Sequence, residues 1–106
     1  MQFIISSRTD ALTQPIREHI QERLGAALDQ HASRVSRINV VLEDENGPRG
    51  GIDQVCRVAV KLSNGMTLHH VRRGMDLYAN ISLVADTVKR RVGRKIAHLR
   101  DKRKAK

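Results

Sequence analysis

Two groups of residues in this chain could act on another molecule. One cysteine and five histidines could supply a nucleophile, a general base or metal ligands, and the lysines and arginines could bind phosphate groups. The basic residues are unevenly placed. Residues 89–106 hold ten Lys or Arg and one acid, which gives +9, whereas residues 1–88 hold ten of each sign and net to zero. The positive excess of the chain, +9, therefore lies at its C-terminal end.

The cysteine and the histidines do not form a catalytic or metal-binding pattern. Cys56 falls on the apolar side of an alternating stretch, which predicts a buried structural thiol. His69 and His70 are adjacent on a predicted strand and so face opposite ways. The remaining histidines, which have no zinc or triad spacing, are His19, His31 and His98. We therefore expect no enzyme activity, no metal and no cofactor. An enzyme that uses Cys56 or the histidines is the competing hypothesis.

The charge predicts a polyanionic partner, with nucleic acid ahead of an anionic membrane surface. Aromatic residues are few, only Phe3 and Tyr78, so bases cannot be stacked on a platform of rings. Binding should therefore depend on phosphates and shape. A basic end that is merely solvated is the alternative. A single cysteine, no long apolar run and no basic segment before the first apolar stretch favour the cytoplasm.

Periodicity predicts the N-terminal half of the fold. Residues 2–7 are typical of a strand, and Thr13 can cap a helix that has Pro15 in its first turn. The apolar stripe of that helix is Ile16, Ile20, Leu24 and Leu28. From Val35 the period changes to two, and residues 43–51 are predicted to form a charged, glycine-rich hairpin loop.

The C-terminal half predicts a hairpin followed by a long helix. Cys56, Val58, Val60 and Leu62 share one face of a strand, and Asn64-Gly65 predicts a type I′ turn into a strand over residues 66–73. Gly74 should break that strand, and Asp76 should cap the second helix. Its apolar stripe is Leu77, Ile81, Val84, Val88, Val92, Ile96 and Leu99.

The predicted fold is α+β. Its order is β-α-β-β-β-α, with a four-stranded sheet, the last three strands antiparallel, and two helices packed on one face. A helix over residues 76–100 would be about 37 Å long, against roughly 27–30 Å for strands of eight or nine residues. The basic helix should therefore project past the sheet. Lys95, which falls inside the apolar stripe, would then have nothing apolar facing it. Tyr78 is expected as a half-buried ring over the sheet near the first strand, with an RNA-contacting hydroxyl as the alternative.

Several segments together resemble a known family. They are Arg8 after the first strand, L-T from Leu12, I-R-E-H-I-Q-E-R-L from Ile16, N-G at 64–65 and G-M-D-L-Y-A-N-I from Gly74. Over nearly the whole chain they are similar to the ribosome hibernation-promoting factors and ribosome-associated inhibitors, also called sigma-54 modulation proteins. The chain resembles the short form of this family, and its basic end favours the members that promote ribosome dimers.

The resemblance implies a fold like that of double-stranded-RNA-binding domains and a cytoplasmic translation inhibitor of resting or stressed cells. Its partner would be the small ribosomal subunit, with 16S ribosomal RNA, bound in the mRNA/tRNA channel. Residues 1–100 would form a single ribosome-binding domain, a monomer away from the ribosome, and residues 101–106 a basic tail. A transcription modulator that acts on a sigma factor or DNA is the alternative.

The rRNA-binding residues implied by position are Arg8, Arg17, Arg23, Arg90, Arg91, Arg94 and Lys95. Helix geometry adds Lys89 and Arg100. The chain departs from the family at Ser82, where Asp is common, and at Thr87 and Ile96, where Lys is common.

Overall fold

The computed structural model describes the backbone of residues 1–46 and 52–104 and the side chains of residues 1–45 and 53–99. The elements are β1 (Gln2–Ser7), α1 (Gln14–Leu28), the short 3₁₀ helix η1 (Asp29–Arg34), β2 (Val35–Asn46), β3 (Ile52–Leu62), β4 (Thr67–Gly74) and α2 (Leu77–Lys104). The predicted β-α-β-β-β-α order is confirmed.

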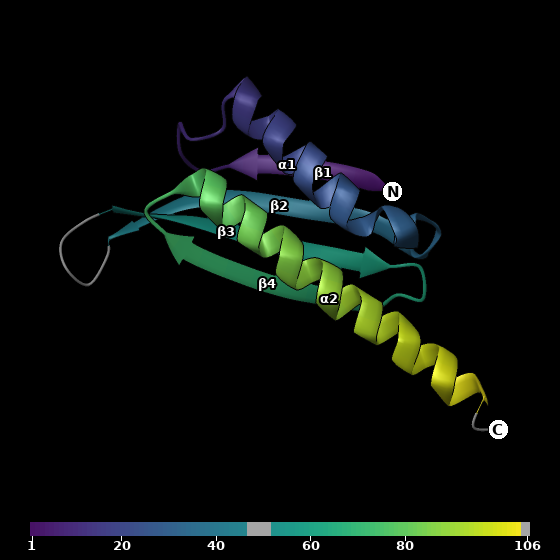
Figure 1. The fold of residues 1–106 in the computed structure, drawn as a ribbon. Helices are drawn as coiled ribbons and strands as arrows, with labels where there is room; N and C mark the ends of the chain where they lie inside the picture. The colour runs from purple at the N-terminus through teal and green to yellow at the C-terminus, as the bar shows by residue number, and fades with distance from the viewer. Residues whose placement is uncertain (47–51, 105–106) are drawn as a thin grey trace.

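The four strands form one mixed sheet in the order β1-β2-β3-β4. β1 runs parallel to β2 because α1 carries the chain back across the sheet between them, whereas β2, β3 and β4 pair antiparallel through short connections. Both helices cover the same face and run side by side (Figure 1). The other face, called the open face below, carries no helix.

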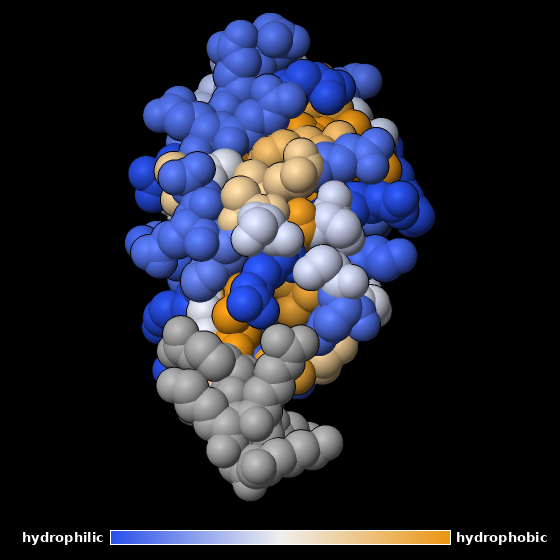
Figure 2. All heavy atoms as spheres, turned by 90° about the vertical axis from the view of Figure 1, so that its right-hand side faces the viewer, coloured by the Kyte–Doolittle hydropathy of each residue, from blue (hydrophilic) through white to orange (hydrophobic). Residues whose placement is uncertain are grey.

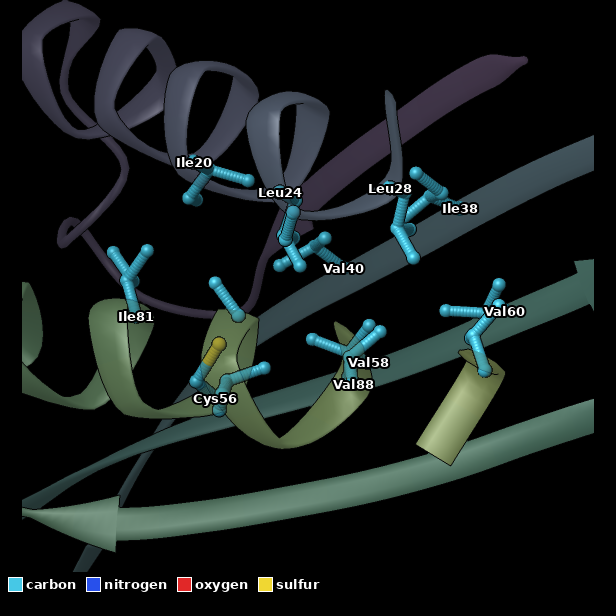
Figure 3. Close-up of a cluster of buried hydrophobic side chains, with 14 of the residues drawn as sticks. Ile20, Leu24, Leu28, Ile38, Val40, Cys56, Val58, Val60, Ile81 and Val88 are labelled. Carbon is cyan, nitrogen blue, oxygen red and sulfur yellow. The ribbon is translucent and has the colours of Figure 1, made fainter. Parts of the chain in front are cut away.

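The core lies between the helices and the sheet. The predicted stripe of α1 and the part of the α2 stripe from Ile81 to Val92 are buried against alternate residues of β2 and β3, and Leu77 is partly buried beside them. Figure 3 shows Ile20 of α1 and Ile81 of α2 directed toward each other in the space between the two helices. Each fully buried aliphatic side chain contributes roughly 1.5–3 kcal/mol, so burial rather than intrinsic propensity stabilises α2, whose stripe contains three valines.

Two predicted loops differ from the structure. Glu43, Asp44 and Glu45 were expected in a loop, but they belong to β2, which pairs with β3 as far as Asn46. Residues 47–51 lie outside the described residues. β2 continues through the three charged residues because Val55, Gln54 and Asp53 of β3 pair with them.

The β3–β4 hairpin is present, but its type I′ turn was wrong. Gly65 has a φ of 92°, whereas Asn64 has no positive φ. The N–H of Leu62 donates to the carbonyl of Met66 at 2.8 Å, and that of Gly65 to the carbonyl of Leu62 at 3.0 Å. This three-residue loop places its one left-handed position at glycine, so Asn64 need not adopt it. β4 ends at Gly74 itself, one residue beyond the predicted strand end at Arg73.

Both predicted helix caps are confirmed. Thr13 Oγ1 accepts from the Ile16 N–H at 3.4 Å, and Asp76 Oδ1 accepts from the Ala79 N–H at 3.1 Å. α2 continues to Lys104 instead of ending near Arg100, and it projects past the sheet as predicted (Figure 1). Over the residues described, neither helix combines the length and apolar character needed to cross a bilayer.

Candidate nucleic-acid interface

The junction between β4 and α2 sets the direction of the basic helix. Asn80 is 4% exposed, and its Nδ2 donates to the carbonyls of Gln54 at 3.1 Å and Gly74 at 3.2 Å. One side chain therefore holds the start of α2 against both β3 and β4. A Cβ on residue 74 would lie 2.6 Å from Asn80 Oδ1, so this close approach requires glycine.

α2 presents its cations beyond this junction in two environments. Lys89, Arg90 and Arg94 are exposed, whereas Arg91 and Lys95 are partly buried. The side chain of Arg100 lies outside the described residues. At about 100° per residue, Arg90, Arg91 and Arg94 fall within one half of the helix surface. Arg91 contacts β4, so this half of α2 lies on the β4 side of the helix.

Arg91 binds the edge of the sheet. Its guanidinium donates a hydrogen bond to the main-chain carbonyl of His69 in β4, an outer strand. Part of its donor capacity therefore serves to close a sheet edge and to fix α2 beside β4. Position in the helix could not reveal this contact.

Two shallow grooves lie along the basic side of α2. The larger, about 560 Å³, is lined by Arg72, Leu83, Asp86, Thr87, Lys89 and Arg90. The smaller, about 350 Å³, is lined by Leu68, Arg91, Arg94, Lys95 and His98. Six cations line the two grooves, against the single carboxylate of Asp86 among the described lining residues. This arrangement suits the phosphates of an extended polyanion rather than an enclosed small molecule.

The expectation for Lys95 was wrong in one respect. Lys95 is partly buried, and Leu68 of β4 lines the same groove, so an apolar side chain does share its surroundings. The charge is tolerated because the groove opens to solvent and the lysine stem can lie along the leucine while its ammonium group reaches water.

Sequence reasoning missed Arg72. This exposed residue of β4 lines the larger groove with Lys89 and Arg90. The alternation along β4 was a usable signal, because Leu68, His70 and Arg72 must share the face that the helices cover. Arg73 points to the open face, where its Nε lies 2.9 Å from Glu45 Oε2.

The structure does not bring all the predicted cations together. Arg8 follows β1 and lies 3.6 Å from Glu43, whose place in the alternation of β2 puts it on the open face. Arg17 and Arg23 both lie on α1, but six residues separate them by about 120° around the helix. The described α2 cations and Arg72 thus form one surface, called the α2–β4 strip below, and the three N-terminal arginines do not share it as a group.

The residues considered for catalysis have other roles. Cys56 is 1% exposed, and burial raises the pKa of its thiol to about 12, so the thiolate is strongly disfavoured. His69 and His70 face opposite sides of the sheet as expected. Among the described residues, no three His, Cys, Asp or Glu side chains gather as metal ligands would.

His70 lies under the α2–β4 strip. Its Nε2 is buried and has no hydrogen-bond partner among the described residues. Desolvation, followed by the charges of Arg91 and Arg72, lowers the pKa of this imidazole. The two arginines thus disfavour a third positive charge beneath them.

The placement expected for Tyr78 was wrong. Its ring packs against His19 of α1, with the ring centroids 4.8 Å apart, instead of covering the sheet near β1. The ring is 47% exposed and links the starts of the two helices.

The comparisons with known proteins agree with this fold. Residues 3–100 match the sequence profile of the family described as "Sigma 54 modulation protein / S30EA ribosomal protein". The chain belongs to this family. This membership supports a ribosome-associated role, and it confirms the resemblance seen in the sequence.

Two solved structures share the architecture. A ribosomal subunit interface protein from Coxiella burnetii has a TM-score of 0.73 at 16% identity, over 92% of this chain and 99% of that one. The N-terminal domain of Protein Y from Thermus thermophilus has a TM-score of 0.70 at 21% identity, over 89% and 98%. At these identities the likeness concerns the fold. No curated protein sequence is similar enough to be counted as a relative.

The view of the molecule from the end past which α2 projects shows hydrophilic side chains surrounding a narrower apolar area (Figure 2). With one exposed tyrosine already packed on His19, the described residues offer no platform on which bases could stack.

Proposed function

We propose that this protein binds the small ribosomal subunit through 16S ribosomal RNA, in the channel for mRNA and tRNA, and thereby inhibits translation in resting or stressed cells. The observation that carries the proposal is the α2–β4 strip, on which Arg72, Lys89, Arg90, Arg94 and Lys95 line two adjoining grooves on a helix that projects from the sheet. Membership of the S30EA family supports the ribosomal partner.

The physical basis is phosphate recognition by a preorganised row of cations. Asn80 and Arg91 fix α2 against β3 and β4, so the helix does not lose much conformational freedom on binding. Phosphate contacts release counterions, and the slope of log K against log salt falls by roughly 0.7–0.9 per phosphate neutralised. Sequence-independent contacts suit folded ribosomal RNA, whose shape supplies the specificity.

Cosedimentation with purified small ribosomal subunits at rising salt tests the proposal. We expect association at low salt that weakens steeply as salt increases, and weaker association with subunits already loaded with mRNA and initiator tRNA. Equal affinity for loaded and empty subunits would contradict the channel site. No association at low salt would refute the ribosomal function itself.

The same salt titration distinguishes ribosome binding from the alternative function, a transcription modulator that acts on a sigma factor or DNA. The words "Sigma 54 modulation protein" in the family's description favour testing this alternative. Affinity for duplex DNA equal to that for the subunits would favour it. Cys56→Ala is the neutral control for association, because its buried thiol carries no charge and should not contact the subunit, whereas rapid labelling of Cys56 by thiol reagents in the folded protein would favour the enzyme hypothesis.

A further inference from the structure

The two ends of the open face differ in how their basic side chains are paired with carboxylates. At the end where β2 finishes, Arg57 lies 3.3 Å from Glu43 and 3.4 Å from Glu45, and Arg73 lies 2.9 Å from Glu45. Arg8 joins the same group through Glu43. The cations at this end are therefore matched by carboxylates.

At the other end, two cations face each other. Arg37 of β2 and Lys61 of β3 are direct cross-strand partners, and both are exposed. Neither takes part in the ion pairs found among the described side chains. Glu43 is six residues from Arg37 along β2, which is roughly 20 Å. Like charges directly opposite one another on a sheet are destabilising.

A β-bulge lies directly beside this pair. The register is regular from Asn46 back to Arg37, which pairs with Lys61, and it shifts before Val35, which pairs with Leu62, so Ser36 is the extra residue. Arg37 faces the open side because its neighbour Ile38 is buried, and the extra residue returns Val35 to the buried side. The Ser36 hydroxyl donates to the Lys61 carbonyl at 3.1 Å. Bulges of this kind commonly re-aim a side chain.

The pair lies near the edge of the sheet that Arg91 contacts. Arg91 crosses from α2 to the carbonyl of His69, and His69 pairs with Ala59, two residues from Lys61. β4 and β2 are separated by two strand spacings, about 10 Å. α2 projects past the same end of the sheet, where the β3–β4 hairpin lies (Figure 1).

We propose that Arg37 and Lys61 form a second phosphate-binding point, on the open face, for an RNA backbone that leaves the α2–β4 strip and turns around the edge of β4. This inference rests on the proposed function and adds a contact on the side of the sheet away from the helices. Two like charges held opposite each other, at a cost in stability, are the pattern expected where a ligand supplies the missing opposite charge.

The experiment measures binding and stability on the same variants, Lys61→Gln, Arg37→Gln and the double variant. Affinity for purified small ribosomal subunits is measured as a function of salt, and the melting temperature is measured without RNA. Arg73→Gln is the matched control, since it removes one positive charge from the same face at the end where Glu45 neutralises it.

We expect Lys61→Gln to reduce the salt slope by about 0.7–0.9 and the affinity by roughly 3- to 10-fold. Its melting temperature should rise by about 1–4 °C, since the repulsion is relieved. Arg73→Gln should leave the salt slope unchanged and should not raise the melting temperature. Higher stability with unchanged binding would refute the second contact while the ribosomal function stands. If the unmodified protein does not bind subunits at all, both proposals fail together.

Discussion

The two helices lie side by side on one sheet, yet the charges of α1 are balanced and those of α2 are mostly positive. α1 holds two arginines and two glutamates, and its arginines are about 120° apart around the helix. α2 holds nine Lys or Arg and two Asp, and its described cations line two adjoining grooves beside β4. The same layer of the fold therefore contains a balanced helix and a strongly cationic one. Packing needs an apolar stripe from both, but it does not need segregated charge from either.

The largest expected effect separates the two helices by charge reversal. Arg90→Glu with Arg94→Glu should lower affinity for the small subunit by about 100-fold near 0.1 M salt, because both residues line grooves of the strip. Arg17→Glu with Arg23→Glu changes the net charge equally, but it should cost about 10-fold or less. Salt-dependent cosedimentation measures both. Unchanged urea midpoints serve as the folding control, and equal losses for the two pairs would show that net charge alone determines binding.

The next effect compares how the helices are anchored. Asn80→Ala leaves the carbonyls of Gln54 and Gly74 without their donor and should lower the free energy of unfolding by about 2–3 kcal/mol. Thr13→Ala removes a partly exposed cap of α1 and should cost about 1 kcal/mol. Urea denaturation measures both values. A smaller loss at Asn80 than at Thr13 would show that the α2 junction does not depend on this amide.

The smallest effect concerns pH. The pKa of His70 is lowered in the folded protein, so below its ordinary value of 6.5 the unfolded chain binds a proton that the folded one does not. Stability should therefore fall as pH decreases from 6.5 toward the lowered pKa, and His70→Gln should remove this part of the pH dependence. Urea unfolding of both proteins across this window measures it. Parallel pH profiles would mean that neither burial nor the charges of Arg91 and Arg72 lower the pKa of this imidazole.

The comparison of the helices also shows what could be predicted. The period of 3.6 identified the buried stripes of both helices, and Thr13 and Asp76 gave their first residues. These features depend on neighbours within a few positions. The extent of β2 and the three-residue loop at Ser63–Gly65 were not predicted, because both depend on pairing with β3 and β4.

Some residues of the candidate site could be predicted from neighbours in the sequence, and others could not. Lys89, Arg90 and Arg94 could be placed on the solvent side of α2 from the apolar stripe alone. Arg72, which is distant in sequence, enters the strip only because α2 packs beside β4. Arg91 was predicted as an rRNA-binding residue, and its hydrogen bond to the carbonyl of an edge strand was not predicted.

The sequence by itself determined the α+β order, the two amphipathic stripes and the concentration of positive charge at one end, because each is a property of residues close together in the chain. The tertiary structure decided which cations share a surface. It set Arg72 beside Lys89 and Arg90, assigned Arg91 to the edge of β4, and left Arg37 opposite Lys61. The physical reason is that a charge becomes part of a site through the distance to its neighbours, and strand register and helix packing fix that distance.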